Sequence, residues 1–173
     1  MSSPKPASIS TDKSKLLPWL WFAIAALVIV LDQWTKMAVS ASFAYGERLE
    51  VIPSLFNLTL RHNYGVAFSI FDQVGGGQRW PLSALAAVVS IALAIWIWRI
   101  GGKAGFEVTG LSLVLGGALG NLYDRVAYGY VVDFIEFYWG TAYFPAFNIA
   151  DSAICAGAAC LLLDAFLSRS QHK

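Results

Sequence analysis

Four long apolar runs restrict the possible folds of this chain more than any other feature of its sequence. They cover residues 16–39, 82–100, 106–123 and 148–167. Each approaches the ~20 residues with which an α-helix crosses the hydrocarbon core of a bilayer. The 173-residue chain is 57% hydrophobic and 13% charged, with a mean hydropathy of +0.59 that a soluble domain does not reach. The sequence therefore predicts an all-α polytopic membrane protein with four transmembrane helices.

Two segments between these runs are more polar. Residues 42–79 contain an alternation of apolar and polar positions from Phe56 to Arg61, bounded by turn-forming residues such as those of Gly75–Gly77. This pattern predicts a small β-rich element on the membrane surface. Residues 125–147 interleave aromatic and acidic side chains, which is typical of an aromatic loop at the membrane interface.

The basic residues set the expected orientation. Most of them fall in the two tails and in the short loop after residue 98: Lys5, Lys13, Lys15, Arg99, Lys103, Arg169 and Lys173. By the positive-inside rule these segments are cytoplasmic, and the polar segments 42–79 and 125–147 are periplasmic. We expect a disordered tail at 1–15, one membrane domain at 16–167 and a second tail at 168–173. A formal net charge of +1 gives no reason to expect a nucleic-acid partner. A cleaved signal peptide is disfavoured because the first run is too long and contains charged residues.

Two aspartates lie at the ends of the last two runs. Asp124 closes the third run, and Asp151 opens the fourth, each three residues after an asparagine. Because the third run leads outward and the fourth inward, both carboxylates are expected at the outer face. A carboxylate at the centre of a membrane helix costs about 2.5–3.5 kcal/mol, and one within a membrane segment is a functional hypothesis by default.

Glycines on the third run favour a close approach of the two aspartates. Gly116, Gly117 and Gly120 share a helix face with Asp124, and the fourth run is rich in alanine. If the carboxylates come within ~4 Å, ionising both costs on the order of 4 kcal/mol at an effective dielectric constant of about 20. The pair then shares a proton, so one member can activate water while the other protonates a leaving amine. No metal or cofactor is required for this chemistry.

Other readings of these residues remain open at this point. Asp124 can form a surface ion pair with Arg125, and Asp151 can be the capping partner of Asn148. Asp32 and Lys36, four residues apart, predict a supporting ion pair. A Ser-Lys site would combine Lys36 with Ser69 or Ser152.

Two rival functions also remain. A small proton-coupled carrier would relay protons through Asp32, Asp124 and Asp151, but no comparable chain of groups continues inward. An assembly protein without chemistry would tolerate Asp-to-Asn changes except for their effect on stability.

Five blocks of this sequence resemble the bacterial lipoprotein signal peptidases, or signal peptidase II. They are spread from the first run to the fourth: Asp32-Gln-Trp-Thr-Lys36, Asn63-Tyr-Gly-Val-Ala-Phe-Ser69, Gly116-Gly-Ala-Leu-Gly-Asn-Leu-Tyr-Asp-Arg125, Val132-Asp-Phe134 and Phe147-Asn-Ile-Ala-Asp-Ser152. The resemblance implies an aspartyl endopeptidase of the bacterial inner membrane, a monomer with its active site toward the periplasm. It implies that the substrate is a prolipoprotein with a diacylglyceryl cysteine, cut on the amino side of that cysteine among membrane lipids.

The resemblance also implies roles for nine residues. Asp124 and Asp151 are expected to form the catalytic pair. The expected substrate-binding residues are Asn63, Asn121, Arg125 and Asn148, and the expected supporting residues are Asp32, Lys36 and Asp133.

Overall fold

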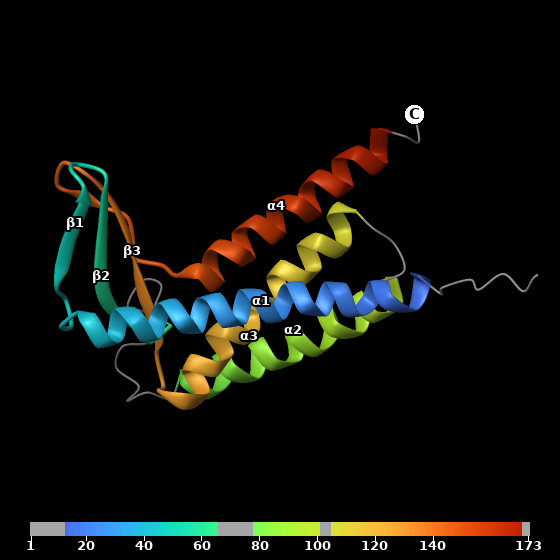
Figure 1. The fold of residues 1–173 in the computed structure, drawn as a ribbon, viewed down its shortest axis with the longest axis horizontal. Helices are drawn as coiled ribbons and strands as arrows, with labels where there is room; N and C mark the ends of the chain where they lie inside the picture. Colours follow the sequence, from blue (N-terminus) through green and yellow to red (C-terminus); the bar gives the residue numbers. More distant parts are fainter. Residues whose placement is uncertain (1–12, 66–77, 101–104, 171–173) are drawn as a thin grey trace, which may run out of the picture.

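The computed structural model describes residues 13–65, 78–100 and 105–170, with side chains from 18 to 169. In this part of the chain, helices and strands follow one another in the order α1 (Lys13–Ser42), β1 (Arg48–Ile52), β2 (Phe56–Asn63), α2 (Arg79–Ile100), α3 (Phe106–Ala127), β3 (Val131–Trp139), β4 (Ala142–Tyr143) and α4 (Ile149–Ser170). Figure 1 shows the helices as an elongated bundle with the strands at one end. The four predicted apolar runs are therefore all helical. Residues 1–12, residues 101–104, for which a cytoplasmic loop was predicted, and Ser69 lie outside the described residues.

Three of the helices are long and apolar enough to cross a membrane. The candidate spans are Pro18–Ser42, Arg79–Ile100 and Ile149–Arg169. Most of their side chains lie on the surface of the molecule, where large apolar residues such as Val88 are exposed. This is the arrangement that lipid-facing helices require.

The third helix, α3, does not reach the same hydropathy. Its sequence contains several glycines together with Asn121, Asp124 and Arg125. However, α3 packs against all three other helices, and ten of its residues are buried. Its neighbours shield it from lipid, so it needs less apolar surface of its own. The prediction that α3 is a fourth transmembrane helix stays a prediction.

The glycines of α3 face two different neighbours. A Cβ atom at Gly116 would lie 2.7 Å from the carbonyl oxygen of Ala25 in α1, whereas one at Gly117 would lie 2.3 Å from that of Ala150 in α4. We expected all of these glycines to serve the contact with α4. Successive helical residues differ by about 100° in direction, so Gly116 and Gly117 cannot contact the same helix. The small residues therefore hold α3 close to both α1 and α4.

The strands form one antiparallel sheet in the order β1-β2-β3-β4. The prediction of an aromatic loop at 125–147 was wrong for most of that segment: α3 continues to Ala127, and the nine-residue β3 pairs along β2. The segment lacks a simple alternation because its first four strand residues are all buried. Val132 and Phe134 pack with Leu60 and with Val39 near the end of α1, which fixes the sheet to the bundle.

Candidate active site

A buried ionic cluster connects α1 to α3. The Nζ atom of Lys36 lies 2.7 Å from Asp32 Oδ2 and 2.8 Å from Asp124 Oδ2, and all three side chains are at most 3% exposed. The ammonium also donates to Asn121 Oδ1 at 3.1 Å. A lysine ammonium has three N–H donors, and here each has an acceptor. The predicted supporting pair of Asp32 and Lys36 is thus present, and Asp124 is part of the same cluster.

Asp124 is saturated by further hydrogen bonds. Gln33 Nε2 donates to its Oδ1 at 2.8 Å, and the backbone N–H of Val132 donates to its Oδ2 at 3.1 Å. Its ion-pair partner is Lys36, and no ion pair with Arg125 is found among the described residues. Asp124 therefore joins α1, α3 and β3. We find no hydrogen bond between Asp124 and Asp151 in the described part of the chain; the two are connected through Lys36 and Asn121.

Asp133 and Asp151 are held by a single asparagine at the start of α4. Asn148 Nδ2 donates to Asp133 Oδ1 at 2.7 Å, and Asn148 Oδ1 accepts from the backbone N–H of Asp151 at 2.8 Å. The second contact is an N-cap, which satisfies one of the free N–H groups in the first turn of a helix. On its other side Asp133 accepts a bond from Asn63 Nδ2 at 2.9 Å. The sheet and α4 thereby bring two carboxylates to one place.

The electrostatic environment of Asp133 is unusual for an aspartate. Burial, and to a smaller extent the nearby charge of Asp151, raises its pKa from 3.8 to about 7. Hydrogen bonds from Asn63 and Asn148 and the charge of Lys36 oppose this rise without cancelling it. Its hydrogen-bond donors are neutral amides. Asp133 is consequently a carboxyl group that exchanges its proton near neutral pH.

A second asparagine holds Asp151. Asn121 Nδ2 donates to Asp151 Oδ1 at 2.8 Å, and Asn121 Oδ1 accepts from Asn148 Nδ2 at 3.2 Å as well as from Lys36. The two asparagines therefore contact each other, and each donates from its amide to the carboxylate of a different aspartate. Within the described residues, the Oδ2 atom of Asp151 has no hydrogen-bond partner, and the residue is only partly buried.

Arg125 lies half-buried beside this group. It donates from one terminal nitrogen to the carbonyl oxygen of Asn121 at 3.3 Å, while its buried Nε atom has no hydrogen-bond partner among the described residues. A buried donor without a partner is costly unless another molecule supplies an acceptor. Arg125 is thus the predicted site residue that still has an unused donor.

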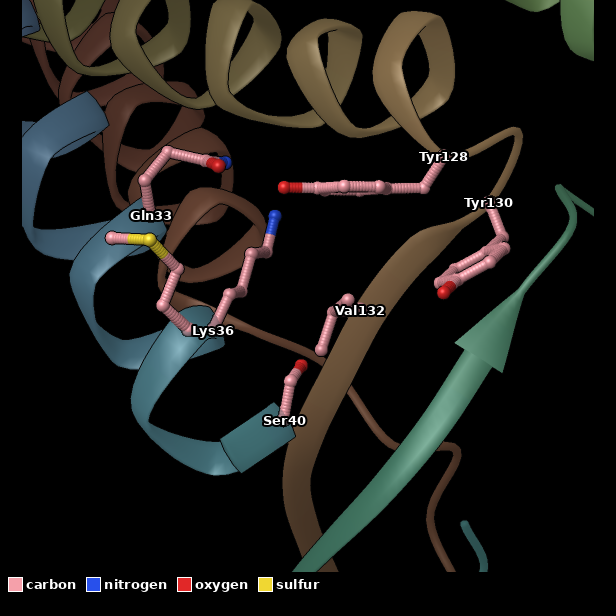
Figure 2. Close-up of a pocket in the computed structure, with 7 residues that line it drawn as sticks. Gln33, Lys36, Ser40, Tyr128, Tyr130 and Val132 are labelled. Atoms are coloured by element: carbon pink, nitrogen blue, oxygen red, sulfur yellow. The ribbon is translucent and has the colours of Figure 1, made fainter. Parts of the chain in front are cut away.

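Sequence reasoning missed Gln33, which binds both Asp32 and Asp124. The only local signal was its position inside the block that begins at Asp32. Gln33 and Lys36 also line a small pocket of about 180 Å³, together with Met37, Ser40, Tyr128, Tyr130 and Val132. Figure 2 shows this pocket between the outer part of α1 and the segment that follows α3. Neither Asp133 nor Asp151 lines it.

Comparison with known proteins relates this architecture to one family. The family described as signal peptidase (SPase) II matches residues 24–167. The lipoprotein signal peptidase of Teredinibacter turnerae is 54% identical over 153 residues, which cover 88% of this chain and 90% of the relative. That of Pseudoalteromonas translucida is 47% identical over 159 residues, covering 91% and 94%.

Solved structures agree with these relatives. A bacterial membrane enzyme determined by the in meso method at 2.3 Å resolution is 33% identical and superposes with a TM-score of 0.77, covering 90% of this chain and 92% of that one. A second such enzyme, at 1.9 Å resolution, is 32% identical with a TM-score of 0.70. Family, relatives and fold coincide over nearly the whole chain, which therefore belongs to the signal peptidase II family.

Proposed function

We propose that this protein is an aspartyl endopeptidase that removes the signal peptide from diacylglyceryl-modified prolipoproteins, cutting on the amino side of the lipidated cysteine. Membership of the signal peptidase II family supports the reaction and the substrate class. The position of the carboxylates, between the sheet and the first turn of α4, supports the chemistry. A cysteine anchored by lipid chains holds its peptide bond at headgroup depth, where the outer end of a membrane helix lies.

The catalytic pair in this proposal is Asp133 and Asp151. The observation that carries it is their shared support by Asn148, in a place where Asp133 has a pKa of about 7 and forms no ion pair with a cation of the described residues. Asp124, which we assigned to the pair from its sequence motif, instead has a lysine at 2.8 Å and accepts two further hydrogen bonds, one from Gln33 and one from the backbone of Val132. A carboxylate that is ion-paired and accepts hydrogen bonds at both of its oxygens is a poor general base. We therefore place Asp124 among the supporting residues.

The two aspartates take different roles. Asp133 starts protonated and donates a hydrogen bond to the carbonyl oxygen of the scissile peptide. Asp151 starts ionised and accepts a proton from water through its free Oδ2, so that the hydroxyl oxygen forms a bond to the carbonyl carbon. The tetrahedral intermediate then breaks its C–N bond, the amine of the lipidated cysteine takes the proton held by Asp151, and the acyl part leaves as the carboxyl end of the signal peptide.

The predicted substrate-binding residues divide into two groups. Asn63, Asn121 and Asn148 already use their side-chain amides on the aspartates, so we propose that they orient the pair. Arg125 keeps a buried Nε donor without a partner, so we propose that it binds a backbone carbonyl of the substrate. The sequence-based expectation of direct substrate contact is thus retained for Arg125 alone.

The membrane placement completes the proposal. We propose that α3 crosses the bacterial inner membrane with the other three helices, that both termini are cytoplasmic, and that the sheet lies on the periplasmic side of a monomer. The burial of α3 between apolar neighbours supports its membrane position. The charge distribution of the tails supports the orientation.

Replacement of each aspartate tests the assignment. In purified protein, Asp133→Asn and Asp151→Asn should each lower the cleavage rate of a diacylglyceryl prolipoprotein by about a thousandfold or more, because each removes one proton carrier. Their thermal unfolding should be close to that of the wild type. Asp124→Asn should mainly lower thermal stability, since it leaves Lys36 with one carboxylate fewer.

The half-buried Asp164 near the inner end of α4 supplies the control, because Asp164→Asn removes a carboxylate away from this group. Full activity of folded Asp133→Asn would reject our pair and restore Asp124 as the candidate. Full activity of folded Asp151→Asn would reject aspartyl catalysis.

A further inference from the structure

We infer that Lys36 is a positioning residue for the catalytic pair, and that it acts by setting the orientation of the Asn121 side-chain amide. This inference rests on the proposed function. Three contacts carry it: Lys36 Nζ to Asn121 Oδ1 at 3.1 Å, Asn148 Nδ2 to the same oxygen at 3.2 Å, and Asn121 Nδ2 to Asp151 Oδ1 at 2.8 Å.

An asparagine amide has two ends of nearly the same shape but opposite hydrogen-bonding character. If the amide of Asn121 were reversed, its oxygen would face the carboxylate of Asp151, and two acceptors would repel each other. Lys36 prevents this reversal because an ammonium only donates, so it binds the oxygen and never the NH₂ group. The NH₂ group is thereby directed at Asp151. Lys36 influences the catalytic base without touching it.

The position of Lys36 is itself closely determined. Asp32 and Asp124 hold its ammonium at 2.7 and 2.8 Å. Asp32 in turn accepts from the backbone N–H of Ala150 in the first turn of α4 at 2.9 Å. A Cβ atom at Gly120 would lie 2.8 Å from Asp32 Oδ2, so the glycine leaves room for this carboxylate. The ammonium is therefore fixed relative to the helix that carries Asp151.

The second amide is oriented from the opposite side. The N-cap bond from the backbone of Asp151 occupies the oxygen of Asn148, so its NH₂ group must face Asp133. Each aspartate of the pair thus receives an N–H from one amide. The oxygen of the Asn121 amide is bound by Lys36 of α1 and, at a longer distance, by Asn148, whereas the oxygen of the Asn148 amide is bound by the backbone of α4 and not by Lys36. Removing Lys36 should consequently affect Asp151 and spare Asp133.

Asn121→Asp separates orientation from a purely structural role. The new carboxylate still accepts from Lys36, but when ionised it cannot donate to Asp151, so kcat should fall at least a hundredfold at pH 8 in a folded protein. When acid protonates the new side chain, its O–H can replace the lost N–H. The ratio of the variant's kcat to that of the wild type should therefore rise about tenfold or more between pH 8 and pH 5. A ratio that stays constant over this range would overturn the inference.

The matched control is Asn57→Asp. Asn57 is also a buried asparagine, but it belongs to a separate group on the sheet with Glu136 and Arg48. The activity of this variant should follow the pH dependence of the wild type. Asp133→Asn and Asp151→Asn are measured with the same substrate. If the proposed function is wrong, one of these folded variants remains active, and this failure is recognised independently of the result for Asn121→Asp.

A double-mutant cycle tests the route of action. Lys36→Met should lower kcat more than it raises KM, because the base is misaligned while substrate binding persists. In an Asn121→Leu background the same change should have at most about a third of its effect on kcat, since the amide through which Lys36 acts is gone. An equal factor in both backgrounds would contradict the inference. Should Lys36→Met fail to fold, the acid rescue of Asn121→Asp decides the question.

Discussion

Asp133 is buried next to a second carboxylate, and in the part of the chain that the structure describes its hydrogen-bond donors are neutral amides. Its pKa of about 7 has a direct consequence for catalysis. A carboxyl group that must donate a hydrogen bond from its O–H is active below its pKa and inactive above it. We therefore expect the cleavage rate to decline about tenfold for each pH unit above 7, and a pH–rate profile of the wild-type enzyme checks this.

The hydrogen bond from Asn63 provides a test of this prediction, because its removal should shift the pH dependence in a known direction. The bond favours the ionised form of Asp133 and so lowers its pKa. Asn63→Ala removes that contribution, so the alkaline limb of the profile should move to higher pH. Asn57→Ala, on the same strand, should leave the limb where it is. A shift to lower pH in Asn63→Ala would show that the limb does not report Asp133.

The choice of catalytic aspartates illustrates what single residues reveal in a sequence. The sequence predicted nine residues for the site, and the structure brings these residues together around the start of α4. The side chains that each aspartate contacts were not apparent, because the repeated Asn-x-x-Asp spacing suggested that Asp124 and Asp151 were equivalent. Asp124 is in fact paired with a lysine from a distant helix, and no local spacing indicates such a contact. Asp133 received a lesser role because its segment was expected to be a loop.

At the scale of elements, α3 is the helix on which the others are arranged. Its apolar run was clear in the sequence, and so was its glycine content. The sequence did not show which neighbouring helix each glycine contacts, because this depends on where those helices lie. The same limit applies to β3. Its first four residues are all buried, so its sequence does not alternate between apolar and polar positions, and its pairing with β2 joins segments that lie far apart in the chain.

Gly117 is the most crowded of the α3 glycines. An added methyl group would lie 2.3 Å from the carbonyl oxygen of Ala150, which cannot move without moving the first turn of α4. Gly117→Ala should therefore lower the free energy of unfolding by about 1–3 kcal/mol and reduce cleavage by displacing Asp151. Thermal unfolding and initial rates measure the two effects. Ala158→Leu, on the exposed face of α4, should change neither the stability nor the cleavage rate. An equal loss of stability and activity in both variants would argue against close packing as the cause.

At the scale of the whole molecule, the sheet and the cytoplasmic segments should lie on opposite sides of the membrane. Composition and hydropathy were enough to predict a helical membrane protein, and three helices qualify as spans by length and composition. The proposed orientation is testable in cells with a variant in which Cys155 and Cys160 are replaced by alanine. Ser54→Cys, in the turn between β1 and β2, should react with a membrane-impermeant maleimide from the periplasm. Ser168→Cys should react only after the inner membrane is opened, and the reverse pattern would invert the orientation.

The buried cluster of Asp32, Lys36 and Asp124 also bears on how the chain is made. During synthesis α1 enters the bilayer with its two opposite charges one helical turn apart, so they neutralise each other. α3 follows later with Asp124 unpaired and with a lower hydropathy than the other three helices. On the proposed topology, the ammonium of Lys36 offsets the cost of placing this carboxylate in lipid. We therefore expect α3 to insert as it docks onto α1, which requires α1 to stay near the translocon until α3 has emerged.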